Sequence, residues 1–283
     1  MGGKLDTRAI GLDAGLHFIR WLTGAENLHY GYWEGLEVTA GNLRAAQEAY
    51  TERLFSYLPG GPLRILDIGG GAGETAKKLI ALGHQVEIVV PSALLAARCR
   101  ANAPGAVVHE CRFEDFETDG RFDLCLFSES FQYVGLDRGL SGALRLLGEG
   151  GDILIADCFR SDAWRGQKGA VVGGGHRWTD FQTELGRHPL EIAASEDITG
   201  AVAPSVDLEQ GLFNVIGHVL FQLDGELAAK KPAMRWGVHR LMALVMNRRR
   251  RERLRVRLME KTRDSEVFER FNSYRILRLR RRG

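Results

Sequence analysis

The sequence predicts an α/β fold with a doubly wound parallel sheet. Short apolar runs alternate with helix-like segments between residues 63 and 159, which is the rhythm of βαβ units. The runs FDLCLF (122–127) and DILIAD (152–157) are almost continuously apolar, as strands buried on both faces are. In ILDIGGGAGETAKKL (65–79), a strand-like run passes through a cluster of glycines into a helical pattern.

Helical and strand-like segments flank this alternation. Residues 8–56 have a helical pattern interrupted at 27–35, and PGGP (59–62) ends it. After residue 159 a glycine-rich stretch at 160–179 predicts a mobile loop, and LEIAASEDIT (190–199) predicts a strand. Ser205 is expected to cap an amphipathic helix that reaches residue 223, and YRILRLRRR (274–282) has a strand pattern.

Composition and charge limit the class of protein. An apolar content of 45% and a charged content of 26% are ordinary for a soluble globular chain. The sequence shows neither a signal peptide nor a membrane-spanning run. The four cysteines are scattered, which favours free thiols in a reducing compartment, and no His, Cys, Asp or Glu pattern predicts a metal. We therefore expect a cytoplasmic protein.

The basic residues gather near the C-terminus. Residues 235–283 hold 17 Lys and Arg against 5 Asp and Glu, so the other 234 residues carry a net charge of −10. The run NRRRRERLRVRLMEKTR (247–263) predicts a solvated helix face, an anionic lipid or diphosphate contact that would make the protein peripheral to a membrane, or a dock for an acidic carrier protein. Nucleic acid is disfavoured because the rest of the chain is acidic.

The glycine cluster differs from two common nucleotide loops. No Lys-Ser or Lys-Thr follows it, which excludes the phosphate loop. Gly69 and Gly71 begin a dinucleotide pattern, but Glu74 stands where its third glycine belongs, at the helix end that would hold a pyrophosphate. Asp67 at the end of the strand suits an ammonium group. The turn is therefore expected to hold a ligand with a cationic amino acid end and no phosphate.

Asp67 through Gly73 resembles the first motif of the class I S-adenosylmethionine-dependent methyltransferases. LHYGYWEG (28–35), FDLCLFSESFQYV (122–134) and EDITGAVAPS (196–205) resemble segments of their small-molecule branch, the tocopherol, sterol and glycine-sarcosine type enzymes. The closing FERFNSYRILRLRR (268–281) is similar to their last strand. The resemblance implies a Rossmann-like fold and S-adenosylmethionine as cofactor. The implied cofactor-binding residues are Asp67, Gly69, Gly71, Gly73, Tyr32, Pro91, Ser92, Phe113 and Ser128.

The chain departs from that family at two strand ends. Val90 stands where relatives have an acid for the ribose hydroxyls, and Glu87 is expected to face the other side of the strand. Ser92, just beyond Pro91, is the candidate substitute. Arg112 stands where many relatives hold the adenine amino group with an acid, and Phe113 beside it either packs on adenine or is an ordinary strand-end aromatic.

Catalytic candidates come from three segments. Tyr30, with Tyr32 and Trp33, is expected to lie over the cofactor, where aromatic faces attract a sulfonium methyl; the alternative is packing of the N-terminal helix. Glu129 and Gln132 follow the fourth strand, at the sheet edge where α/β ligands bind. His176 is the candidate general base because its intrinsic pKa is near neutral, and His218 is the second histidine candidate.

The sequence thus predicts methyl transfer to carbon or oxygen of a hydrophobic small molecule. Expected regions are an N-terminal helical lid (1–58), a cofactor-binding α/β core (59–160) and a substrate cap with closing strands and the basic C-terminal region (161–283). Two alternatives stay open: a catalytically silent binding or partner subunit, and methylation of an acceptor held by a carrier protein.

Overall fold

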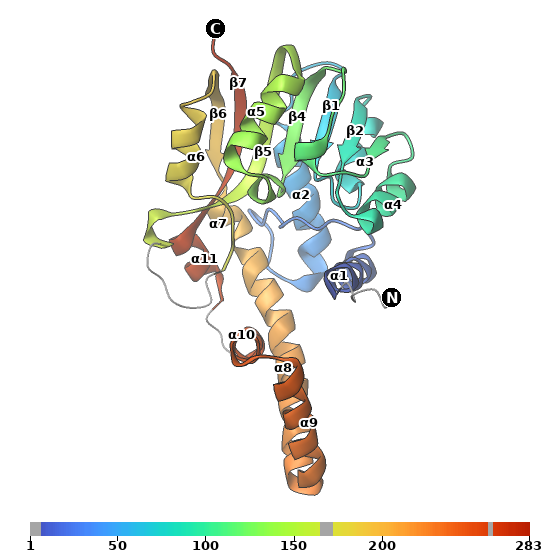
Figure 1. Ribbon diagram of the computed structural model, residues 1–283, viewed down its shortest axis with the longest axis vertical. Coiled ribbons are helices and arrows are strands. Elements are labelled where there is room, and N and C mark those ends of the chain that lie inside the picture. The colour runs from blue at the N-terminus through green and yellow to red at the C-terminus, as the bar shows by residue number, and fades with distance from the viewer. Residues whose placement is uncertain (1–6, 165–171, 260–262) are drawn as a thin grey trace.

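The computed structural model describes residues 7–164, 172–259 and 263–283. The described residues form one seven-stranded sheet, in which β7 alone runs antiparallel to both of its neighbours (Figure 1). Its spatial order is β3-β2-β1-β4-β5-β7-β6. The strands are β1 (Arg64–Ile68), β2 (Gln85–Val89), β3 (Val107–His109), β4 (Phe122–Ser128), β5 (Leu147–Arg160), β6 (Leu190–Asp197) and β7 (Asn272–Arg281).

Helices cover both faces of this sheet, which confirms the doubly wound prediction. The helices of the described residues, of which α8, α9 and α10 lie apart from the sheet, are α1 (Thr7–Thr23), α2 (Leu43–Phe55), α3 (Glu74–Ala81), α4 (Ala93–Asn102), α5 (Leu136–Leu146), α6 (Trp178–Leu185), α7 (Thr199–Val202), α8 (Pro204–Lys230), α9 (Pro232–Val245), α10 (Arg248–Met259) and α11 (Ser265–Phe271). The two strands predicted near 190–199 and 274–282 are β6 and β7. Of the predicted glycine-rich loop, residues 165–171 lie outside the described residues.

Two apolar cores separate the sheet from its helices. Successive strand residues point to opposite faces, so Ile65 belongs to one core and Leu66 to the other. The first core also takes in apolar residues of α2, α3, α4, α7 and α11, whereas the second takes in those of α5 and α6. Parallel strands buried on both sides explain the nearly continuous apolar runs of β4 and β5.

The segment between α1 and α2 is fastened to the start of α8. Ser205 Oγ accepts hydrogen bonds from Trp33 Nε1 at 2.8 Å and from the Gly31 amide at 3.0 Å. The prediction that Ser205 caps α8 is wrong: Pro204 begins that helix, and Ala203 before it already has helical backbone angles. The hydroxyl instead satisfies two buried donors of the N-terminal segment.

We expect Ser205→Ala to lower the free energy of unfolding by about 2 kcal/mol, because it leaves two buried N–H donors without an acceptor. Chemical denaturation measures this change. Ser56→Ala is the matched control, because the Ser56 hydroxyl bonds only the Arg53 carbonyl at an exposed helix end, and it should change the value by less than about 0.5 kcal/mol. Equal effects of the two variants would contradict the prediction.

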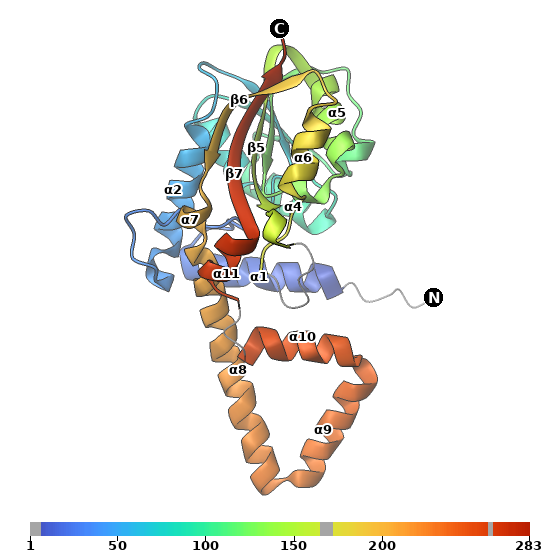
Figure 2. The same ribbon diagram turned by 90° about the vertical axis from the view of Figure 1, so that its left-hand side faces the viewer.

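Helices α8, α9 and α10 project from the sheet as a long arm (Figures 1 and 2). Figure 2 shows them as the three sides of a triangle, with α8 leading away from the sheet and α10 returning to α8. We call residues 204–259 the arm. Among the described residues, no helix is long and apolar enough to cross a membrane.

Candidate active site

The site lies where the strand order reverses. β1 and β4 are neighbours in the sheet, but their chains continue to opposite sides, and such switch points form ligand crevices at the carboxyl ends of parallel strands. The Ser130 hydroxyl, after β4, donates to the Ile68 carbonyl at the end of β1. A Cβ atom at Gly69 would lie 2.5 Å from Ser130 Cβ. The loops after β1 and β4 therefore form one unit.

The glycine turn after β1 brings bare backbone to the crevice. Gly69, Gly71 and Gly73 have φ values of 75°, 56° and 90°, which side chains other than glycine rarely adopt. Gly73 also packs on α4, since its added Cβ would lie 2.9 Å from Cys99 Cα. At Gly71 the nearest atom to an added Cβ is Leu28 Cδ1, at 4.0 Å. Gly71 thus leaves space at the surface of the turn.

Asp67 supplies an unpaired carboxylate beneath this turn. Its side chain is 1% exposed, and Oδ2 has no hydrogen-bond partner among the described residues. Burial raises the pKa of Asp67 to about 7. An isolated buried carboxylate is unfavourable, so the residue fits a cationic donor such as the ammonium group of an amino acid. The fit supports the predicted cofactor.

A cavity of about 250 Å³ opens beside the end of β4. Residues from six separated parts of the chain surround it. They are Tyr30, Glu129, Gln132, Tyr133, Cys158, Gly173, Gly174, Arg263 and Tyr274. The structure therefore brings the predicted residues Tyr30, Glu129 and Gln132 together at one cavity.

Glu129 is the acid of this cavity. Its backbone has φ 55°, unusual for a side-chain-bearing residue, and its amide donates to the Ala156 carbonyl at 2.8 Å. Its Oε1 accepts from the Tyr30 amide at 2.8 Å and from the Tyr274 hydroxyl at 2.9 Å. Burial raises the pKa of Glu129 to about 7, against the opposing effect of these two donors. Such a value suits a general base near neutral pH.

Two tyrosines position the Glu129 carboxylate: Tyr274 bonds it directly, and Tyr50 bonds Tyr274. The Tyr50 and Tyr274 hydroxyls are 2.7 Å apart, and both rings are fully buried. Tyr50 also lies 3.3 Å from the Ser128 hydroxyl. Since Tyr274 donates to Glu129, Tyr50 donates to Tyr274. This chain of hydroxyls fixes the direction of the Glu129 carboxylate.

Asp157 is a third buried acid near the cavity. Its carboxylate accepts from the Gln132 amide at 3.0 Å and the Cys158 amide at 2.7 Å. Burial raises its pKa to about 7. Because it accepts two backbone donors, Asp157 orients the turn that carries Gln132.

These acids make the ligand-free fold more stable in mild acid. For Asp67, Glu129 and Asp157, the folded pKa of about 7 exceeds the ordinary value of about 4, so the folded state binds more protons between these values. Stability should therefore fall as pH rises from about 4 to about 7, and then level off.

The prediction is a higher melting temperature at about pH 5 than at about pH 8 for the ligand-free protein, measured by calorimetry. Asp67→Asn should reduce the difference, whereas Asp119→Asn, at an exposed position, should leave it unchanged. A melting temperature that rises from pH 5 to pH 8 would contradict the assignment.

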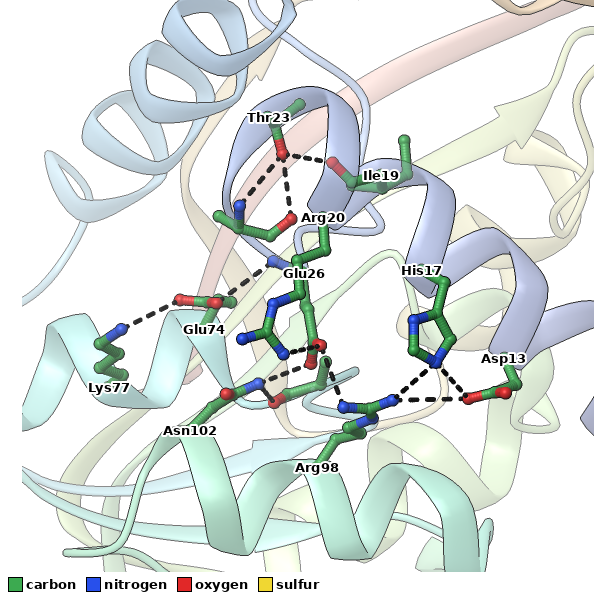
Figure 3. A network of polar contacts seen from close by, with 12 residues as sticks. Asp13, His17, Ile19, Arg20, Thr23, Glu26, Glu74, Lys77, Arg98 and Asn102 are labelled. Atoms are coloured by element: carbon green, nitrogen blue, oxygen red, sulfur yellow. Dashed lines mark hydrogen bonds and ion pairs between the residues drawn. The ribbon is translucent and has the colours of Figure 1, made fainter.

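A buried acid ties the N-terminal segment to the glycine turn (Figure 3). The Glu26 side chain is 3% exposed and accepts from Asn102 Nδ2 at 2.8 Å, with Arg20 and Arg98 each at 3.3 Å. Asn102 also donates to the Ala72 carbonyl within the turn, at 2.9 Å. The Glu26 amide donates to Glu74, at the start of α3. The segment after α1 therefore lies against the predicted cofactor turn.

The structure shows the surroundings of Val90, which stands where relatives have a ribose-binding acid. Val90 is fully buried, and Glu87 pairs with Arg64 at 2.7 Å and His109 at 2.8 Å. Ser92 caps α4 through a bond from the Leu95 amide, and Pro91 before it is exposed. The Ser92 hydroxyl retains its proton for donation, because the cap uses it only as an acceptor. Its contact with ribose stays a prediction.

Phe113 lies within the second core. Its ring meets Phe127 edge to face, with the ring centroids 5.5 Å apart, and the side chain is 6% exposed. The structure gives it the packing role that was the alternative to adenine contact. Arg112 before it is exposed.

Tyr32 and Trp33 do not line the cavity. The Tyr32 hydroxyl donates to Glu34, and Trp33 is buried against Leu43 and Ala46. Of the three aromatic residues expected over the cofactor, only Tyr30 borders the cavity. Trp33 has the packing role that was the alternative, and the cofactor contact of Tyr32 stays a prediction.

The two histidine candidates are placed away from the chemistry. His176 Nε2 lies 2.8 Å from the Val134 carbonyl and 3.2 Å from that of Phe131. Carbonyl oxygens only accept, so Nε2 carries a proton and braces the turn after β4. His218 is exposed on the arm. Neither residue borders the cavity, so the geometry does not support either as the base.

Sequence reasoning missed several residues of the cavity and its support. Tyr274, Cys158 and Arg263 border it, and Tyr50 and Asp157 support it. The strand pattern at 274–282 was the available signal for Tyr274, because alternate residues of a strand next to β5 face the same side.

One group of possible metal ligands was also missed. Atoms of Asp137, Glu184 and His188 lie within 4.8 Å of one another, on the surface of α5 and α6. None of the three borders the cavity. Exposed acids often cluster in this way without an ion, so we assign the group no role.

Comparisons with known proteins agree with this arrangement. A family model described as a methyltransferase domain matches residues 65–151. A ubiquinone biosynthesis O-methyltransferase of Rhodopseudomonas palustris (strain BisB5) is 31% identical over 143 residues, which is 44% of this chain and 56% of that protein. The chain thus spans about half the length of the curated relatives it matches.

Solved structures share the fold over nearly the whole chain. Geranyl diphosphate C-methyltransferase from Streptomyces coelicolor A3(2) superposes with a TM-score of 0.65 at 15% identity, covering 99% of this chain and 100% of that one. The cyclase SpnF superposes with a TM-score of 0.63 at 18% identity, covering 96% and 95%. At such identities the likeness concerns the fold alone.

Proposed function

We propose that this protein transfers a methyl group from S-adenosylmethionine to carbon or oxygen of a hydrophobic small molecule. Residues 65–151 match a family model described as a methyltransferase domain, and a solved C-methyltransferase shares the fold. One observation carries the proposal: two carboxyl groups, the buried Asp67 and the half-buried Glu129, stand on the joined loops at the switch point. Asp67 suits the cofactor's ammonium, and Glu129 faces the acceptor cavity.

Some residues of the site bind the cofactor, and others accept the proton of the acceptor. S-adenosylmethionine supplies an activated methyl group on a sulfonium. Asp67 holds the amino acid end, and the glycine turn lets the backbone approach it closely. Glu129 accepts the proton of the acceptor, while the Tyr30 amide and the Tyr274 hydroxyl aim its carboxylate. Orientation of the acceptor supplies much of the remaining rate enhancement.

The cavity and the names of similar proteins support the proposed class of acceptor. The cavity of about 250 Å³ suits a small molecule or the reacting end of a longer one. The relatives include both an O-methyltransferase and a C-methyltransferase, which supports oxygen or carbon as the methylated atom. Three tyrosines line the cavity together with Glu129, Gln132 and Arg263, so the lining combines aromatic rings with charged and polar groups. Such a lining supports an acceptor that has an apolar body and a polar reacting group.

Isothermal calorimetry with S-adenosylmethionine and S-adenosylhomocysteine tests the proposal. We expect both to bind the full chain. No binding of either up to millimolar concentration would overturn it, as would a phosphate-bearing ligand found in the crevice. Mass spectrometry of ligands that co-purify with the protein identifies the acceptor class.

A second candidate is a catalytically silent binding subunit. The observation that favours it is Val90, which is buried where relatives have a ribose-binding acid. A cyclase with the same fold supports the view that this scaffold also serves other purposes. Binding of S-adenosylhomocysteine without turnover of any acceptor would favour this candidate.

A further inference from the structure

The arm displays an unusual amount of apolar surface. Its α8 and α9 helices expose many large apolar side chains by 39% or more of their area. They are Val215, Ile216, Val219, Leu220, Phe221, Leu223, Met234, Trp236, Val238, Leu241, Met242, Leu244 and Val245. So many exposed apolar side chains on two neighbouring helices are typical of a binding surface rather than of ordinary solvent contact.

Helix α9 turns its polar side to α8. Arg235 makes two bonds of 2.9 Å to Asp224 of α8, and His239 Nε2 lies 2.9 Å from the same carboxylate. No residue of α9 is buried. Met234, Val238, Leu241 and Val245 follow one another at helical spacing. They form an exposed apolar stripe that is separate from the ion-paired side.

The third helix of the arm is strongly basic. Helix α10 has seven arginines and one glutamate, and the first four arginines, Arg248–Arg251, are exposed. Arg255 and Arg257 pair with Glu252 and Glu209. The exposed arginines stand next to the apolar helices without a matching set of acids on the arm, so the arm combines apolar surface with excess positive charge.

A second copy of this chain is a poor match for such a surface. Two arms packed together would bring their arginine-rich helices into mutual repulsion. The described part of the acidic remainder offers charge, but its exposed apolar residues stand at separate places in the fold, as Trp21, Leu82 and Val107 do. The arm is better matched by a surface whose outer layer is anionic and whose interior is apolar.

We propose that the arm docks on an anionic lipid bilayer. The apolar stripe of α9 and the exposed side chains of α8 enter the boundary between headgroups and acyl chains, and the arginines of α10 meet lipid phosphates. Trp236 suits this boundary, where amphipathic rings gather. The arm lies on the membrane, in keeping with the absence of a spanning helix among the described residues.

Docking sets the position of the cavity relative to the bilayer. Arg263, which follows α10 after a short interval, borders the cavity. Arg263 lies just before α11, and Figure 2 shows α11 beside the start of α8, at the root of the arm. The cavity therefore lies near the root of the arm. If the proposed methyl transfer holds, this position favours acceptors dissolved in the membrane. The docking itself does not depend on that function.

Vesicle flotation of the full chain tests the proposal. We expect flotation with phosphatidylcholine vesicles that contain phosphatidylglycerol, much less with phosphatidylcholine alone, and loss of binding at high salt. Removing three arm charges with Arg249→Gln, Arg250→Gln and Arg251→Gln should weaken binding at least about tenfold. The matched control replaces exposed Arg121, Arg138 and Arg145 with Gln, and should leave binding unchanged.

A second pair of variants tests the exposed apolar surface of α9. Leu244 is 84% exposed on the arm and Leu82 is 62% exposed on the body, so neither substitution opens a core. Leu244→Gln should weaken vesicle binding several-fold and Leu82→Gln should not. Circular dichroism checks that the helices are retained. Neither readout involves S-adenosylmethionine, so failure here leaves the methyl transfer proposal standing.

Three results would overturn membrane docking. The first is no flotation with either vesicle. The second is equal binding to both vesicles, which would show that the arginines take no part. The third is a dimer detected by light scattering that Leu244→Gln dissociates while vesicles bind nothing, which would make the arm an interface between copies.

Discussion

Replacing Glu129 with glutamine should lower kcat for methyl transfer by about a hundredfold or more, with little change in the affinity for S-adenosylmethionine. Loss of a general base typically costs two to four orders of magnitude. Glutamine keeps the size of the side chain and an oxygen that accepts from the Tyr30 amide and the Tyr274 hydroxyl. The change therefore removes proton acceptance while the local packing is retained. Single-turnover kinetics with a saturating acceptor measures it.

The pH profile provides an independent check on Glu129. A base must be ionised to act, so kcat should rise with pH and level off at or below about pH 7, since burial raises the pKa of Glu129 to about 7 and a nearby sulfonium lowers it. Tyr274→Phe removes a donor that favours the ionised form. The rising limb should then move to higher pH.

Two outcomes would contradict the role of Glu129. One is a kcat for Glu129→Gln within threefold or so of the unaltered protein, since a lost base costs far more. The other is a rising limb that persists in that variant. Asp119→Asn, a surface substitution that also removes one carboxylate, serves as the control and should leave both kcat and its pH profile unchanged.

Replacing Asp67 with asparagine should weaken S-adenosylmethionine binding by roughly ten- to a hundredfold, because a charge-assisted bond contributes about 1.5–3 kcal/mol. The Oδ2 atom of Asp67 is buried without a partner, so the ligand's ammonium would be its main stabilising contact. Calorimetry measures the dissociation constant. The variant itself should fold, because a neutral amide is less costly to bury than an unpaired carboxylate.

The affinity should also depend on pH through Asp67. In the free protein its pKa is raised to about 7, and an ammonium partner lowers it, so binding releases a proton below that pH. The dissociation constant should therefore decrease from about pH 5.5 to about pH 7, by up to tenfold per unit. Asp67→Asn should abolish this dependence. A variant that binds as tightly as the unaltered protein would refute the assigned contact.

The α/β core was predictable because its signals are local. A few consecutive residues indicate each part of a βαβ unit. Apolar runs indicate the buried strands β4 and β5, and glycines mark the turn after β1, where φ is positive. Glu129 could also be proposed from the sequence, because ligands in this class of fold bind at the carboxyl ends of parallel strands beside a switch point.

The support of the site was not predictable in this way. Tyr274 reaches Glu129 across 145 positions of sequence, and Ser205 reaches Trp33 across 172. Such pairs depend on how distant elements pack, and a single sequence carries no record of them. His176 illustrates a second limit of the sequence, because a near-neutral intrinsic pKa does not reveal that the ring nitrogen contacts the Val134 carbonyl.

The position of β7 between β5 and β6 has a consequence for how the chain is made. β6 hydrogen-bonds only to β7 in the sheet, and the whole arm is synthesised before β7 leaves the ribosome. During synthesis, β6 therefore has no partner strand, and the cavity lacks Tyr274, until β7 has emerged. Because β6 and β7 are separated by the whole arm, closing the loop between them comes late, so we expect β6 to become ordered only after β7 is available for pairing.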